Sequence, residues 1–376
     1  MAYLTYFDLV ESLITSSYGG PQDAEQRDIR TAIHRAYNEL TTIRDWSYYH
    51  VHGRVITRPS QTASVSYVDG PVVYTQAGLP ASDYTHIRAG DRVAQIEKCL
   101  DPGTNTAWSI STAVPLPADT LQPGDTLTFY KSIYALPSDF RNLDEPSDEF
   151  NWWSGMYVTP DQAMKTERVN TSAGAPYHWT VIKDPLSTGW ALKLVGYPSG
   201  VETIDFTYRR SARPLKYSGH EAALRQGTIA RSVRTITGSG TAFPADAAGA
   251  ILRVGTTADS PGTIESLTPW VAESLITTRT SATSMQTDAT GTIASTTRYL
   301  ITDPIDIPAH MYGVMDSACD YFLARIRGKD VEKAAQLYQR DLRLAMEMDQ
   351  LAPLSGRSRE VWHDGGWRSP LQADGG

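Results

Sequence analysis

The sequence predicts an α+β fold in which helical hairpins from both chain ends form one α-helical platform, with antiparallel β-barrel or sandwich domains inserted between them. Two observations predict it. Apolar residues recur with the helical period near both ends of the chain, and in the middle they alternate with polar residues in runs separated by Gly and Pro. An amphipathic helix must bury its apolar stripe against another element. We therefore expect the two ends of the chain to meet.

The N-terminal segment predicts a helical hairpin. Leu4–Thr15 has a helical apolar stripe, and a Gly-Gly-Pro turn ends it. The second helix is expected over Asp23–Tyr49, with a stripe formed by Ile29, Ala32, Ile33, Ala36, Tyr37, Leu40 and Ile43. Its other face carries three basic residues that are candidates for contacts with a neighbouring subunit: Arg30, Arg35 and Arg44.

The C-terminal segment, Ile307–Leu351, predicts the helical partner. Its first helix runs over Met311–Arg327 and is expected to stop at Gly328. Its second helix extends to about Leu351, and the residues expected to face inward are Val331, Ala334, Ala335, Tyr338, Leu342, Ala345 and Met348.

The middle of the chain predicts three β regions. The expected domains are a helical ring-forming domain (1–50 and 307–352), a β-barrel insert (51–137), a central β layer with a short helix (138–231), a second β-barrel insert (232–306) and a flexible C-terminal docking tail (353–376). The two inserts resemble each other: HIRAGDRVAQ matches AGAILRVGTT, TAWSIST matches SATSMQT, and DTLTFYKSIYALP matches TTRYLITDPIDIP. Either the inserts are two copies of one barrel type, or Thr-rich β sequences simply look alike.

Composition limits the function classes. The chain has 376 residues, enough for two or three domains, and a formal net charge of −8, which argues against a protein that grips duplex DNA through a basic face. The two cysteines, Cys99 and Cys319, are read as reduced structural thiols. There is no run of the roughly 18 apolar residues that a membrane span requires, and the N-terminus lacks the pattern of a secretory signal.

No motif for nucleotide binding, nucleophilic catalysis or zinc binding is present, so we expect no catalytic residues, no cofactor and no metal. His50 and His52 share one face of a predicted strand and either bind a metal or are exposed or hydrogen-bonded. The predicted loop Leu136–Glu149 holds five acidic residues that either bind Ca²⁺, act in catalysis, contact a basic patch on another subunit or are simply solvated: Asp139, Asp144, Glu145, Asp148 and Glu149.

Three arginines, Arg209, Arg210 and Arg213, are candidates for that patch, or for contact with a phosphate backbone; we favour subunit pairing with Asp144 and Glu145 because the chain is acidic. The aromatic residues near Trp46 and Trp152 either stack on ligands or anchor a core. The tail is read as a segment that docks on a partner through Arg357, Arg359, Val361, Trp362, His363 and Trp367.

The order of the short motifs DWSYYHV, YALPSDFRNLDEP, NWWSGMYVTPDQ, FTYRRSARPL and DPIDIPAHMY resembles that of the head-to-tail adaptors (connector or tail tubular protein A-like) of short-tailed bacteriophages. The resemblance covers most of the chain. It implies a non-enzymatic structural protein of the virion neck, assembled in the host cytoplasm. Members of this family form rings, typically dodecamers, that bind beneath the portal ring, contact a downstream nozzle or tail-tube protein, and continue the channel through which double-stranded DNA passes.

On this resemblance, the ring is built by Asp23–Tyr49 and Ile307–Leu351, and the tail Pro353–Gly376 reaches the portal. The two β inserts are additional to the compact members. An acidic inner wall is expected to repel DNA and keep the channel slippery. The alternatives are a tail-tube or gatekeeper protein, and a tail-associated glycan-binding protein; the latter would need a carboxylate pair in an aromatic groove to act as an enzyme.

Overall fold

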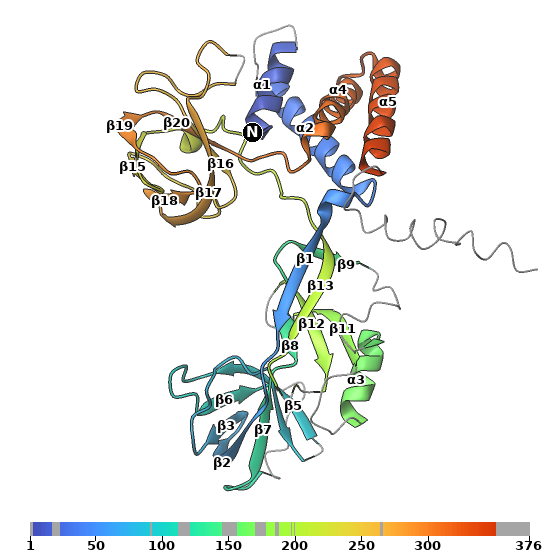
Figure 1. Cartoon of the computed structure of the whole chain (residues 1–376), viewed down its shortest axis with the longest axis vertical. Coiled ribbons are helices and arrows are strands. Elements are labelled where there is room, and N and C mark those ends of the chain that lie inside the picture. Colours follow the sequence, from blue (N-terminus) through green and yellow to red (C-terminus); the bar gives the residue numbers. More distant parts are fainter. Residues whose placement is uncertain are drawn as a thin grey trace, which may run out of the picture. The chain divides into compact units, whose positions relative to one another are not determined.

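The computed structural model describes residues 3–16, 23–90, 92–111, 121–144, 156–169, 178–184, 188–196, 198, 200–263 and 266–350. Helices and strands both occur, which confirms the predicted α+β class (Figure 1). The chain divides into two compact units: Met1–Tyr49 together with Ala212–Gly376, and His50–Ser211. The predicted central domain (138–231) crosses the division after Ser211.

The helices of the first unit come from both ends of the chain. Their bounds are α1 (Tyr6–Ser16), α2 (Asp23–Thr42), η1 (Ser47–Tyr49), η4 (Ala309–Met311), α4 (Tyr312–Arg327) and α5 (Val331–Gln350). α2 packs against α4, and α4 packs against α5. Residues from both ends share one hydrophobic core, and its fully buried members include Ile33, Leu40, Trp46, Met315 and Cys319.

The ends of these helices follow local backbone chemistry. α2 ends at Thr42, earlier than the predicted Tyr49, and Ile43, expected in the buried stripe, is exposed beyond the helix end. Gly328 has φ +68° and ends α4 as predicted, since glycine adopts this left-handed conformation without a Cβ clash.

The buried face of α5 differs from the prediction at one position. Met348 was expected to face inward, but it is exposed, and Asp349 is buried instead. The Asp349 carboxylate accepts hydrogen bonds from the backbone N–H and the hydroxyl of Ser47, at 3.1 and 2.5 Å. This polar contact fixes the rotation of the last helical turn and leaves Met348 at the surface.

The first unit also holds a region of strands, called here the second β region. Its bounds are β14 (Thr228–Ser232), β15 (Thr235–Ser239), β16 (Ile251–Val254), β17 (Ala272–Ser281), β18 (Ser284–Thr287), β19 (Ile293–Thr297) and β20 (Tyr299–Thr302). The strands pair antiparallel in the order β19-β14-β15-β18-β17-β16-β20. Ile236, Leu252, Met285 and Tyr299 lie in its core.

The second unit contains a closed six-stranded barrel, called here the first barrel. Its bounds are β2 (Gln61–Asp69), β3 (Val72–Thr75), β4 (His86–Ala89), β5 (Arg92–Cys99), β6 (Ala107–Ile110) and β7 (Thr126–Tyr130). The closed order is β2-β3-β6-β5-β4-β7. Val65, Ile87, Trp108 and Phe129 fill the interior because alternate residues of each strand face inward.

The strand order supports the predicted repeat. If β14 to β18 are matched in sequence with β2 to β6, and β19 with β20 is matched with β7, every antiparallel pair of the first barrel has a counterpart in the second β region. The three similar sequence segments fall on matched strands: on β4 and β16, on β6 and β18, and on β7 and β20. In the second β region the last strand is interrupted at Arg298, so that β19 pairs with β14 and β20 with β16.

The rest of the second unit forms two further sheets. One has the order β1-β13-β9, with β1 (His50–Ile56), β13 (Thr203–Arg210) and β9 (Phe140–Leu143). The other has the order β10-β11-β12-β8, with β10 (Met156–Tyr157), β11 (His178–Lys183), β12 (Trp190–Val195) and β8 (Ile133–Ala135). The helix α3 (Pro160–Val169) packs against β11 and β12. Side chains of both sheets, including Leu136, Trp179, Leu194 and Phe206, share one core.

These sheets correct three predictions. β1, expected to open the barrel insert, pairs along its whole length with β13. The segment Leu136–Glu149, expected to be a loop, contains β9, because Phe140 is buried beside Tyr208. The central β layer expected over 138–231 is divided between the two sheets, with β13 in one and β11 and β12 in the other.

Candidate functional site

Two of the predicted interface arginines on the N-terminal helix have partners in their own chain. The Arg30 guanidinium lies 2.9 Å from the carboxylate of Glu221, so it ties α2 to the segment that precedes the second β region. Arg44 donates a hydrogen bond to the carbonyl of Met346 at 3.2 Å and lies over the ring of Trp46. Arg35 is exposed, and no partner for it occurs among the described residues.

Arg213 forms an ion pair with the buried carboxylate of Asp303. Its Nε and Nη2 atoms donate to the carboxylate of Asp303 at 3.1 and 3.0 Å. The fully buried Asp303 also accepts hydrogen bonds from the backbone N–H groups of Lys216 and Tyr217. A carboxylate with this many donors compensates for its desolvation. The role of Arg213 that the structure describes is therefore to hold the strand exit of β20 against residues 213–217.

The acidic segment and the arginines of β13 are adjacent within one chain. β9 pairs with β13, and Asp139 accepts a hydrogen bond from the hydroxyl of Tyr208 at 2.9 Å. Arg209 is buried and Arg210 is partly buried. Asp144 lies 2.7 Å from Nδ1 of His50. Glu145 lies outside the described residues, as do all the tail candidates: Arg357, Arg359, Val361, Trp362, His363 and Trp367.

A surface that the sequence reading missed lies along one flank of α5. Leu337, Leu344 and Met348 recur at helical spacing, and the last two are each 52% exposed. On the adjacent face of the same helix, Tyr338 and Ala345 are buried in the helical core. We call Leu337, Leu344 and Met348 the α5 stripe. The apolar residues were visible in the sequence, but the helical period alone does not tell which of two neighbouring faces meets the core.

α4 carries an acidic surface next to its buried face. Asp316 and Asp320 stand one helical turn apart and are both exposed, whereas Cys319 between them is buried. Desolvation of the carboxyl group and the charge of Asp320 raise the pKa of Asp316 to about 6. Burial also raises the pKa of the Cys319 thiol, which agrees with the reading of this cysteine as an unreactive structural residue.

A buried ion cluster joins α1 to the second β region. The Arg253 guanidinium of β16 contacts Asp8 of α1 at 2.6 and 2.7 Å and Glu273 of β17 at 2.9 Å. It also donates to the carbonyl of Tyr3, and the ring of Trp270 lies 5.7 Å away. The sequence signal was an arginine inside the apolar run ILRV, but the partners are too distant along the chain to be recognised.

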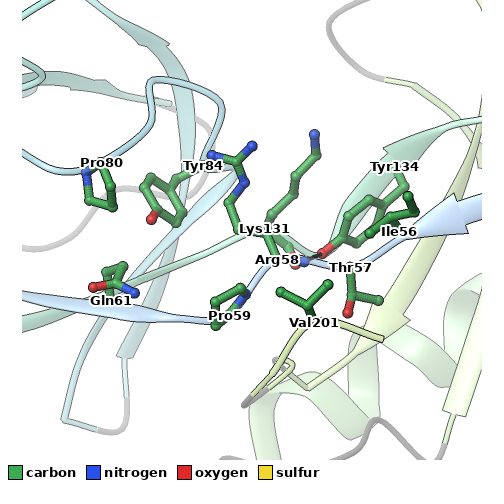
Figure 2. A pocket seen from close by; sticks show the side chains of 10 residues that line it. All are labelled: Ile56, Thr57, Arg58, Pro59, Gln61, Pro80, Tyr84, Lys131, Tyr134 and Val201. Atoms are coloured by element: carbon green, nitrogen blue, oxygen red, sulfur yellow. Dashed lines mark hydrogen bonds between the residues drawn. The ribbon is translucent and has the colours of Figure 1, made fainter. Parts of the chain in front are cut away.

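The second unit has a pocket of about 450 Å³ (Figure 2). Its lining residues are Ile56, Thr57, Arg58, Pro59, Gln61, Pro80, Tyr84, Lys131, Tyr134 and Val201. Beside it, Arg58 and Lys131 converge on the carboxylate of Asp83 at 3.0 and 2.7 Å. Burial acts to raise the pKa of Asp83, but the hydrogen bond from Lys131 and the two positive charges outweigh it and hold the pKa below its usual range.

The polar groups around this pocket bond mainly to one another. The Tyr134 hydroxyl accepts a hydrogen bond from the backbone N–H of Arg58 and donates to the carbonyl of Lys131, both at 3.0 Å. Burial raises the pKa of Tyr134 to about 12, so it stays protonated at neutral pH. These bonds brace the two chain segments that connect the first barrel to the rest of the unit.

Within the described ranges, no group of three His, Cys, Asp or Glu side chains has the arrangement of a metal site. His50 is paired with Asp144, and His52 is exposed. None of the described helices is long and apolar enough to span a membrane. No protein-family model, curated protein or solved structure matches this chain.

Proposed function

We propose that this protein is a structural, non-enzymatic ring subunit of a phage virion: a head-to-tail adaptor that joins the portal ring to the tail and continues the DNA channel. The support from the sequence is the ordered set of motifs that resembles this family. The support from the structure is that helices from both chain ends share one core, as the proposed α-helical platform requires. The virion neck is the location that this proposal implies.

The α5 stripe is the observation that carries the proposal. Leu337, Leu344 and Met348 lie on the surface of a helix whose adjacent face is already buried in its own core. An apolar stripe of this kind is stabilised when another chain covers it. In a ring each subunit contacts the next through a heterologous interface, so one copy of the stripe would be buried at every contact.

The charged residues that are candidates for the subunit interface fall into two groups under this proposal. Arg30, Arg44, Arg213 and Asp144 have partners in their own chain, so their contribution to a ring is to fix the shape of the subunit. Arg35 is exposed and belongs to the subunit contact.

The acidic face of α4, with Asp316 and Asp320, is our candidate for the channel wall, since carboxylates repel the phosphates of passing DNA.

The partners proposed are the portal ring, through the tail 353–376, and a nozzle or tail-tube protein on the opposite side. Mass photometry of the chain mixed with its portal ring tests this. The intact chain should give one discrete species of a portal ring with many copies, a dodecamer in the simplest case. Deletion of 353–376 should abolish that species if the tail is the docking segment.

A second pair of variants tests the α5 stripe. Leu344→Glu places a charge in the stripe and should prevent ring closure, whereas Gln339→Glu places the same charge at an exposed position on the opposite side of α5 and should not. If neither the intact chain nor the variants associate with the portal ring, the adaptor proposal is wrong. The alternatives, a tail-tube or gatekeeper protein and a glycan-binding tail protein, would then be tested by binding to tail components and to cell-surface glycans.

A further inference from the structure

Arg231 of β14 stands among core positions of the second β region. On this strand Ile229 and Arg231 alternate with more exposed residues, so both face the interior. Ile229 belongs to the hydrophobic core, and Arg231 is only 8% exposed. The guanidinium therefore lies in surroundings that, on this face of the strand, are otherwise apolar.

The Arg231 guanidinium is incompletely paired. Its Nε and Nη1 atoms are buried and have no hydrogen-bond partner in the described part of the chain. The charged arginines Arg213 and Arg253 of the same unit, by contrast, each contact a carboxylate. A buried charged donor without an acceptor is strongly destabilising, and proteins normally supply an anion or a hydrogen-bonding group at such a position.

The first barrel provides an internal comparison. Its β2–β3 hairpin turns through Gly70-Pro71, and the β14–β15 hairpin turns through Val233-Arg234. Counting back from these turns, Val68 occupies the position of Arg231. Val68 packs against the core of the first barrel. The first barrel therefore forms with an apolar residue at this position. The stability of the second β region does not explain why Arg231 stands there.

The surroundings of Arg231 are unusual as well. Val233 adopts φ +57° and is 65% exposed, whereas the matched residue of the first barrel is Gly70 at φ +55°. A β-branched residue in this region is strained by about 1–2 kcal/mol. On the other side, Gly291 leaves space beside the guanidinium, because a Cβ there would lie 3.4 Å from Nη2 of Arg231.

We propose that the β14–β15 hairpin end of the second β region is a docking site for an acidic side chain of a partner polypeptide, whose carboxylate pairs with Arg231 next to Gly291. The planar guanidinium offers parallel N–H donors that match the two oxygens of a carboxylate. The exposed Val233 beside it gives the partner an apolar contact, which favours a polypeptide over a nucleic acid backbone. The strain at Val233 is retained because this side chain is part of the contact.

Thermal unfolding of the full chain with sodium acetate as the carboxylate probe tests the site. Acetate should raise the midpoint in a saturable way, by an amount corresponding to an about elevenfold gain in the folded-to-unfolded ratio at ten times the dissociation constant. Sodium chloride at equal ionic strength and sodium phosphate are the comparison arms. A response to phosphate alone would replace the carboxylate with a phosphate ligand and overturn the proposal.

Two variants separate the site from general salt effects. Arg231→Met should lose the acetate response, and Arg234→Met, which removes an exposed arginine of the same turn, should keep it. The Nε–H resonance of Arg231 should shift on adding acetate in the unmodified chain, which is independent of whether the variant folds. If that resonance does not shift and Arg231→Met is more stable than the unmodified chain in every salt, Arg231 has no carboxylate ligand.

Discussion

Replacing Arg253 with Met removes the centre of the ion cluster between α1 and the second β region. Methionine replaces the aliphatic stem of the arginine but not its guanidinium group, so the charge is removed together with part of the buried side-chain volume. Two carboxylates, those of Asp8 and Glu273, then remain at the site without the cation that both contact at 2.6 to 2.9 Å. The carboxylate of Glu273 is almost completely buried.

The expected loss follows from which charges stay behind. Breaking a buried ion pair by removing one partner costs about 3–5 kcal/mol, because the remaining charge is desolvated and unpaired. Two carboxylates that have lost their shared cation place Arg253→Met in this range. The triple variant Asp8→Asn, Arg253→Met and Glu273→Gln removes both carboxylates together with the arginine, so no charge is left unpaired. It should therefore be less destabilised than Arg253→Met alone, even though it changes three residues of the cluster and not one.

Hydrogen exchange measured by mass spectrometry is the suitable assay, because a chain with two units need not unfold in one step. Peptides that cover α1 and β16 should exchange about two to four orders of magnitude faster in Arg253→Met, because each 1.4 kcal/mol is a factor of about ten, while peptides from the first barrel should not change. Two results would show that the cluster does not hold α1 to the second β region. One is that the destabilisations by the three single substitutions add up in the triple variant, and the other is that the exchange rate of these peptides rises less than tenfold in Arg253→Met.

Two further predictions concern single positions. Asp316 has a folded-state pKa of about 6, above its ordinary value, so the folded chain binds more protons between about pH 4 and 6 and stability falls as pH rises through that window. Asp316→Asn should therefore stabilise the chain at pH 8 by about 1 kcal/mol, reduced by solvent screening because the residue is exposed, and the gain should vanish at pH 4 in thermal unfolding curves. Gly53→Ala should destabilise the second unit by about 1–3 kcal/mol, because a Cβ at Gly53 would lie 2.5 Å from the ring of Phe206. The control Gly200→Ala meets no atom within 4 Å and should leave urea unfolding nearly unchanged; equal effects of the two substitutions would refute the steric argument.

The helices were predictable because their stripes are long and regular. What the period could not supply is the exact end of each helix and the rotation of its buried face. Met348 satisfies the helical period as well as Ala345 does, yet it is exposed because Asp349 bonds to Ser47. A contact between residues near opposite ends of the chain decided this, and no local pattern contains it.

The strands were predictable as strands, but their partners were not. β1 reads like any short alternating segment, and it pairs with β13 because Gly53 leaves room for the ring of Phe206. The strand partners within the first barrel and the second β region were easier to predict, since similarity between two segments of one chain carries information about topology as well as about local structure. Their matched strand order could be anticipated from three short segments that recur in the same sequence order.

The charged site candidates show the limit of reading function from residue type. Arg30, Arg44 and Arg213 looked like free surface cations because no acidic residue lies near them at helical or strand spacing. Arg30 and Arg213 instead meet carboxylates, and Arg44 meets a backbone carbonyl, all far away along the chain. Arg253, which does tie two elements together, was passed over because it lies inside a strand. An arginine within an apolar run is the better signal, since burial forces it to have partners.

The topology of the two β regions explains how a chain whose ends form one core can carry both. In the first barrel the first and last strands, β2 and β7, pair with each other, so the chain enters and leaves at neighbouring positions. In the second β region, the backbone N–H of Asp303, just after β20, donates a hydrogen bond to the carbonyl of Tyr217 at 2.9 Å, so the chain again leaves close to the segment through which it enters. A barrel with adjacent ends can be inserted between two residues of a host fold that are themselves close, without displacing them. The host then keeps its own pairing, as β1 and β13 do on either side of the first barrel in sequence. The two insertions therefore add surface to the proposed adaptor without requiring any change in the helices that would build its ring.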